Sequence, residues 1–67
     1  MDVMEKFERN VKSMLEEKGM TQAQLAREMH IAKSSLSNWL KSHREPSISS
    51  IIKIMEVLDC TFEELID

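Results

Sequence analysis

The chain has few of the residues on which many enzymes and secreted proteins depend. Its 67 residues include one glycine, one proline, one cysteine and no tyrosine. A single cysteine excludes an internal disulfide, so we expect a cytoplasmic protein in which Cys60 is a small buried side chain. A single glycine excludes a glycine-rich phosphate loop, and no nucleophile constellation or convergent carboxylate pair is evident. The sequence therefore predicts a protein that is not an enzyme and uses no cofactor.

Long apolar runs are also missing. Charged residues recur every few positions from the N-terminus onward, which excludes a secretion signal and a membrane-spanning helix. The spacing of His30, His43 and Cys60 matches no zinc-finger or zinc-ribbon pattern, so no metal site is expected. At this length we expect a single domain over residues 1–67, with nearly every apolar side chain committed to its core.

Negative charge dominates, but it is unevenly distributed. The formal net charge is −3. Residues 1–20 hold four cations and five carboxylates, residues 21–46 hold four and two, and residues 47–67 hold one and five. Because affinity for DNA rests on cations that meet phosphates, the net charge alone argues against a nucleic-acid partner. A molecule that presents only its basic middle segment, residues 21–46, to its partner is still compatible with binding to a nucleic acid.

The spacing of apolar residues predicts helices and no strands. Apolar residues recur at intervals of three and four over Val3 to Lys18, which is typical of one face of an amphipathic helix. Gly19 is expected to end this helix in a left-handed conformation. Thr21 and Gln24 match a capping box that begins a second helix, which continues to about residue 29.

The turn into the third helix is the weakest junction of the predicted fold. His30 stands where a left-handed residue is expected, a conformation that histidine tolerates less well than glycine. Ala32 stands at the position of the helix cap and offers no side-chain acceptor, a loss of roughly 1 kcal/mol. Ser34 or Ser35 is the alternative cap, and either would shift the start of the helix.

The third helix, which ends at Lys41, has two distinct faces. At 100° per residue its polar side chains fall within an arc of about 140°, while Leu36 and Trp39 fall on the opposite side. Trp39 is therefore assigned to the core rather than to stacking on a ligand. The polar strip consists of Lys33, Ser34, Ser37, Asn38 and Lys41.

Two further helices complete the chain. Pro46 interrupts the chain, and Ser47 is placed to cap a fourth helix that ends at Asp59 in a left-handed conformation. Thr61 and Glu64 repeat the capping box for a short fifth helix that reaches the C-terminus. The apolar stripe predicted for the fourth helix is Ile48, Ile51, Ile52, Met55 and Leu58, widened by Ile54 and Val57.

A set of residues from the second predicted helix onward falls in a recognisable order. The set comprises Thr21, Gln22, Leu25, Ala26, Ile31, Leu36, Trp39, Arg44, Glu45, Pro46, Ser47, Ile51, Lys53, Ile54, Leu58, Thr61, Glu64 and Leu65. In this order and spacing the chain resembles the helix-turn-helix domains of the phage Cro and CI repressors, the XRE family. The resemblance covers nearly the whole chain. It implies an all-α, five-helix, lambda-repressor-like DNA-binding domain in which helices 2 and 3 form the helix-turn-helix.

The resemblance also implies a function and a set of contacts. It implies a sequence-specific regulator of transcription, a repressor, that binds a palindromic operator in double-stranded DNA as a homodimer. No small-molecule substrate is implied, and the dimer surface is expected near residues 60–67. Lys33, Ser34, Ser37 and Asn38 would face bases in the major groove, whereas Gln22, Lys41 and Arg44 would meet phosphates.

Three departures from the family pattern bear on these expectations. His30 and Asp59 replace glycines at the two turns, and Leu15 and Leu40 stand where some relatives pair an arginine with a glutamate. The third helix has neither arginine nor glutamine in its strip, so its preferred bases do not follow from the sequence. An alternative function is a protein-interaction module, such as an antitoxin-like or anti-repressor partner subunit. It is motivated by the net acidity and by the lack of an effector or oligomerisation segment.

Overall fold

Five α-helices follow one another along the described part of the chain. They are Val3–Lys18 (α1), Gln22–Glu28 (α2), Lys33–Lys41 (α3), Ile48–Leu58 (α4) and Phe62–Ile66 (α5). The computed structural model describes residues 2–41 and 45–67, and no strand occurs within these ranges. The predicted all-α fold of five helices is confirmed, and the helix boundaries lie within about one residue of the predicted ones.

Side-chain caps explain where two of the short helices begin. Thr21 Oγ1 accepts a hydrogen bond from the Gln24 amide at 3.1 Å, and Gln24 Oε1 accepts one from the Thr21 amide at 2.8 Å. The same reciprocal pair joins Thr61 and Glu64 at 3.1 and 2.9 Å. Both predicted capping boxes are therefore present, and each satisfies two amides that the helix itself leaves open.

Single caps begin two other helices. Ser47 Oγ accepts from the Ser50 amide at 3.2 Å and starts α4 as predicted. Asp2 Oδ1 accepts from the Glu5 amide at 2.8 Å and starts α1. This aspartate cap was not predicted from the sequence, although aspartate is among the residues preferred at that position.

Three helices end through a residue with left-handed backbone. These residues are Gly19 with φ 64°, His30 with φ 59° and Asp59 with φ 51°. After α2, the Ile31 amide donates to the Ala26 carbonyl oxygen at 3.0 Å, which closes the turn in the pattern usual for such ends. The left-handed conformations predicted for the histidine and the aspartate are confirmed. Glycine adopts this conformation without strain, whereas other residues lose roughly 1–2 kcal/mol.

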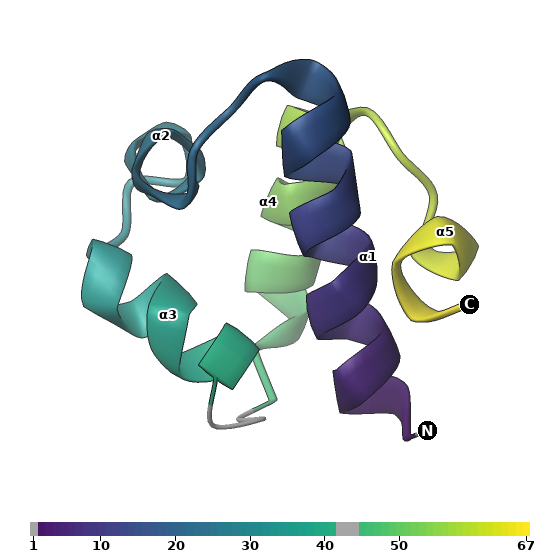
Figure 1. Ribbon diagram of the computed structural model, residues 1–67. Coiled ribbons are helices and arrows are strands. Elements are labelled where there is room, and N and C mark those ends of the chain that lie inside the picture. Colours follow the sequence, from purple (N-terminus) through teal and green to yellow (C-terminus); the bar gives the residue numbers. More distant parts are fainter. Residues whose placement is uncertain (1, 42–44) are drawn as a thin grey trace.

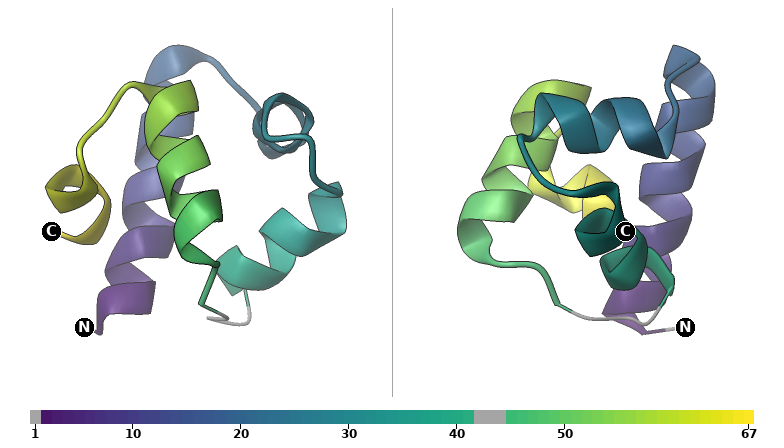
Figure 2. Two further views of the ribbon diagram at one scale, coloured as in Figure 1. Left: turned by 180° about the vertical axis from the view of Figure 1, so that it is seen from behind. Right: turned by 90° about the vertical axis from the view of Figure 1, so that its left-hand side faces the viewer.

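Helix α1 lies between the remaining elements. It packs against α5 on one side and against α3 on the other, while α2 contacts α3 and α4. Figure 1 shows α2 and α3 on the side of α1 away from α5, and both views in Figure 2 agree with this arrangement. The shared core consists of Phe7, Val11, Leu15, Leu25, Ala26, Met29, Leu36, Leu40, Ile54, Leu58 and Leu65.

The short helix α5 is held to α1 by polar contacts as well as by its buried leucine. The Asn10 side-chain amide donates to the Leu65 carbonyl oxygen at 2.9 Å, and the Arg9 guanidinium donates to the backbone oxygen of Asp67 at 3.1 Å. These bonds satisfy carbonyl groups at the end of a helix that is too short to be stable alone. The C-terminal segment is thereby fixed on the side of α1 opposite α2.

The predicted apolar stripe of α4 is wrong at two positions. Ile48 is 80% exposed and Ile52 is 50% exposed, while Ile54 and Leu58 are fully buried. Apolar residues occupy most sides of this helix, so their spacing alone does not say which side meets the core. The packing places the side with Ile54 inward and leaves the side with Ile48 uncovered.

Leu15 and Leu40 are both buried in the core, where some relatives were expected to place an ion pair. No charged or polar residue is buried among the residues that the structure describes. An apolar contact avoids the desolvation of two charges, which often cancels the attraction between them. The packing of α3 against α1 therefore depends on shape and apolar burial.

Cys60 lies half-buried in the turn between α4 and α5 and packs against the core. Burial raises the pKa of its thiol above the ordinary value, and the carboxylates of Glu64 and Asp59 also raise it, whereas Lys18 lowers it. The thiol therefore stays protonated and weakly nucleophilic near neutral pH.

Among the described helices, none combines the length and apolar character that a membrane span requires.

The left-handed residue after α2 provides a test of backbone strain. We expect His30→Gly to raise the free energy of unfolding by about 0.5–1 kcal/mol, because the relief of strain exceeds the extra entropy of glycine in the unfolded chain. Arg27→Gly, in the last turn of the same helix, is the control and should lower it by about 1 kcal/mol. Thermal unfolding followed by circular dichroism measures both changes. If both substitutions lowered the free energy of unfolding equally, the backbone at His30 would not be strained in the wild-type chain.

Candidate nucleic-acid interface

Helices α2 and α3 cross at an angle and are joined by a tight turn. In Figure 1, α2 is seen along its axis while α3 runs across the view. Leu25, Ala26 and Met29 are buried in the core at this crossing, where α2 contacts α3. The packing of these residues holds the turn, so α3 has a fixed direction relative to α2.

Helix α3 begins without a side-chain cap. The Ala32 carbonyl oxygen accepts from the amides of Ser35 at 3.0 Å and Leu36 at 3.4 Å, but its methyl group accepts nothing. The helix nevertheless begins at Lys33, so neither serine shifts the start. Ala32, Lys33 and Ser34 are all exposed, and the first amides of α3 are therefore open to solvent or to a ligand.

The inner face of α3 is anchored by two fully buried leucines, Leu36 and Leu40. Trp39 is half-buried and packs against the same core, as predicted for an apolar rather than a ligand-stacking side chain. These contacts fix the rotation of the helix about its own axis. The opposite side is consequently the one presented to the exterior.

The outer face carries the predicted strip, with one difference in exposure. Ser37 is half-buried, because at 100° per residue it lies about 60° from Leu40, whereas Ser34 and Asn38 lie farther away. The most accessible part of the face is therefore shifted toward Ser34 and Asn38. The exposed members of the strip are Lys33, Ser34, Asn38 and Lys41.

Two of the three residues predicted to meet phosphates are described, and both lie at helix ends. Gln22 is the first residue of α2 and is half-buried, and Lys41 is the last residue of α3 and is exposed. Arg44 lies outside the described residues. Neither Lys33 nor Lys41 forms a salt bridge with a carboxylate in the part of the chain that the structure describes, so both ammonium groups are available to an anion.

The structure brings two further cations close to the helix-turn-helix. Lys12 of α1 shares a shallow hollow with Gln22, and it forms a salt bridge with Glu8 at 3.9 Å. Lys53 of α4 lines another hollow together with Met29 and Ile31 of the turn. The sequence gives no signal for either neighbour, because both depend on how α1 and α4 pack against α2.

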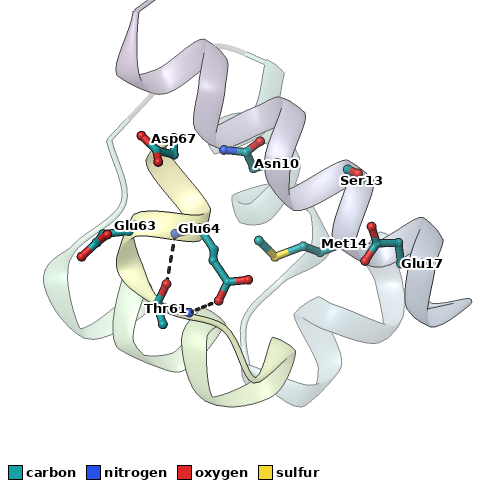
Figure 3. Close-up of a pocket in the computed structure, with 8 residues that line it drawn as sticks. All are labelled: Asn10, Ser13, Met14, Glu17, Thr61, Glu63, Glu64 and Asp67. Atoms are coloured by element: carbon teal, nitrogen blue, oxygen red, sulfur yellow. Dashed lines mark hydrogen bonds between the residues drawn. The ribbon is translucent and has the colours of Figure 1, made fainter.

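The far side of the molecule is acidic. Figure 3 shows a hollow between α1 and α5 whose lining includes the carboxylates of Glu17, Glu63, Glu64 and Asp67. Glu64 is also part of the capping box with Thr61, drawn there as two hydrogen bonds. This side repels a polyanion, whereas the side with α2 and α3 carries the unpaired lysines. The carboxylates of this hollow and the lysines of α3 therefore lie on opposite sides of α1.

Comparison with known proteins agrees with this geometry. A helix-turn-helix family model matches residues 11–65. The fold is similar to the crystal structure of the restriction-modification controller protein C.AhdI from Aeromonas hydrophila, with a TM-score of 0.82 and 26% sequence identity. That match covers 92% of this chain and 94% of that chain. A comparison with curated protein sequences gave no match.

The uncapped start of α3 provides a second stability test. We expect Ala32→Ser to raise the free energy of unfolding by about 1 kcal/mol, because the new hydroxyl can accept from an open amide of the first turn. The corresponding rise in melting temperature is about 4–8 °C for a domain of this size. Ala23→Ser, inside α2, is the matched control and should lower stability slightly. A serine at residue 32 that has no stabilising effect would show that this amide is already satisfied.

Proposed function

Because the chain belongs to the Cro/CI-type (XRE) helix-turn-helix family of DNA-binding transcriptional regulators, we propose that it binds a palindromic DNA operator as a homodimer and represses transcription. Residues 1–67 act as one DNA-binding unit. In this proposal α3 enters the major groove and α2 crosses the phosphate backbone. The observation that carries the proposal is the exposed polar strip of α3, directly opposite the buried Leu36 and Leu40.

The base contacts are assigned to Lys33, Ser34, Ser37 and Asn38. The first two lie in the first turn of α3, the part of the helix that points into the groove in this family. Asparagine can pair in a bidentate way with adenine, and lysine can donate to guanine, whereas a serine hydroxyl is compatible with several bases. Since Ser37 is half-buried, Ser34 and Asn38 have the greater reach within this set.

The phosphate contacts are assigned to Gln22, Lys41 and Arg44. Gln22 is the first residue of α2 and Lys41 is the last residue of α3, so they lie at opposite ends of the helix-turn-helix. Arg44 lies outside the described residues. Contacts of this kind fix the orientation of the protein on the duplex without selecting a sequence. The net charge of −3 does not oppose the proposal, because the acidic hollow lies beyond α1 on the other side.

The two classes of contact differ in what their loss does. Lys41→Ala should weaken binding to every DNA sequence alike and should lower the slope of log K against log salt by about 1, because one phosphate contact is lost. Lys33→Ala or Ser34→Ala should instead change the sequences that are preferred. Binding-site selection followed by titration at several salt concentrations measures both effects.

Lys18→Ala is the matched control for these measurements. It also removes an exposed lysine from the end of a helix, but this lysine lies near Cys60 and outside the strip. Its effect on DNA affinity should be small. The proposal fails if selection enriches no sequence and no complex with DNA forms even at low salt.

The protein-interaction module is the second candidate, and the net acidity of the chain favours it. A stable complex with another protein would support it, provided that the complex persists when Lys33, Lys41 and Arg44 are all neutralised. The same triple variant should lose DNA binding under the first proposal. Measuring both activities on one variant therefore separates the two functions.

A further inference from the structure

One lysine of α1 lies beside the start of α2 and is held there by a carboxylate. The residues that line the shallow hollow between these elements are Lys12, Leu15, Glu16, Met20 and Gln22. The Nζ atom of Lys12 lies 3.9 Å from Oε1 of Glu8, one turn earlier in the same helix. The exposed lysines of α3 form no such salt bridge within the described residues. Lys12 thus differs from them in having a partner inside the chain.

The local sequence decides which carboxylate pairs with Lys12. Glu8 stands four residues before it and Glu16 four residues after it, so both lie within about 40° of it around α1. At this spacing a glutamate that precedes a lysine forms the better pair, and the reverse order is weaker. The structure has the favoured pair with Glu8, and no salt bridge joins Lys12 to Glu16 in the described helix. Lys12 is therefore held from one direction only.

This salt bridge draws the ammonium group away from the helix-turn-helix. Glu8 lies about 6 Å nearer to the N-terminus of α1 than Lys12 does, because each residue of a helix rises by about 1.5 Å. Figures 1 and 2 show α2 level with the other, C-terminal end of α1. A rotation of the Lys12 side chain away from Glu8 would therefore bring its ammonium group toward Gln22.

The pair is weak enough for a polyanion to break. The side chain of Lys12 is 49% exposed and that of Glu8 is 26% exposed. Because water screens both charges, a pair of this kind changes an equilibrium constant by no more than about fivefold. A DNA duplex presents closely spaced phosphates, and each cation that neutralises one also releases a counterion. The exchange of Glu8 for a phosphate is therefore favourable for Lys12.

We propose that Lys12 forms a further phosphate contact beside Gln22 and that Glu8 competes with DNA for its ammonium group. This inference rests on the proposed function, in which the start of α2 meets the phosphate backbone. The contact extends the DNA-binding surface from the helix-turn-helix onto α1. Because phosphate contacts carry no sequence information, the competition lowers the affinity for all sequences alike. Glu8 thus sets the strength of binding and takes no part in the choice of operator.

A double-mutant cycle on DNA affinity tests the competition. The probe is a labelled duplex of random sequence at low salt, because phosphate contacts supply non-specific binding and require no operator. Glu8→Gln should tighten binding by about two- to fivefold, since the lysine no longer has to leave a partner. Lys12→Ala should weaken binding by about three- to tenfold and should lower the slope of log K against log salt by about 1. In the Lys12→Ala background, the gain from Glu8→Gln should largely disappear.

Glu17→Gln is the matched control for the carboxylate. It makes the same change on the same helix, but Glu17 lies about 180° around α1 from Glu8 and lines the hollow between α1 and α5. It should tighten binding less than Glu8→Gln does, and by the same factor with or without Lys12, because it acts only through the net charge.

Lys12→Arg is the control for the cation. An arginine can still meet a phosphate, so this variant should keep the salt slope of the wild type. Glu8 and Lys12 both lie outside the buried core, so every variant should fold. Circular dichroism should show the same helix content for all of them.

The outcomes separate this inference from the proposed function. If Glu8→Gln tightens binding equally in both backgrounds, or if Lys12→Ala leaves the salt slope unchanged, the inference is overturned even though the chain binds DNA. If the predicted cycle is found with the random duplex while selection enriches no operator, the inference is supported and sequence-specific regulation is rejected. If no duplex is bound even at low salt, both are rejected.

Discussion

The burial of Leu36 and Leu40 is the contact on which the proposed function of this chain depends. These two leucines decide which side of α3 faces the core, and the strip on the opposite side is thereby turned outward. Helix α3 has only nine residues and would not be stable alone. Its structure and its orientation therefore come from the same apolar contacts with α1 and α2. A substitution that disturbs this core packing would therefore change the direction of the strip without changing any residue within it.

The backbone before α3 is strained at the turn after α2, whereas the start of α2 is stabilised by hydrogen bonds. The turn after α2 holds His30 in a left-handed conformation, and the start of α3 lacks a cap at Ala32. On the other side of the turn, the capping box of Thr21 and Gln24 fixes the start of α2 with two hydrogen bonds. Strained and uncapped backbone thus lies where contact with bases is proposed, and an external partner can satisfy groups that the fold leaves open.

Most of the fold could be predicted from the sequence because its boundaries are set locally. Capping boxes and left-handed turns involve residues within about four positions of one another, and Thr21, Gln24, Gly19 and Asp59 all lie where their chemistry predicts. The orientation of α4 could not be predicted, because apolar residues on most of its sides leave its rotation to tertiary packing. The proximity of Lys12 to Gln22 is a tertiary feature of the same kind. The strip of α3 could be predicted as a face, but not the half-burial of Ser37 within it.

The exposed side of α4 limits what this helix contributes to the stability of the fold. Ile48 and Ile52 remain largely in contact with water, so their side chains add little to the free energy of unfolding. The helix is therefore held to the core chiefly through Ile54 and Leu58, which lie one helical turn apart. Because so small a core leaves little excess stability, substitutions on one side of α4 are far better tolerated than substitutions on the other.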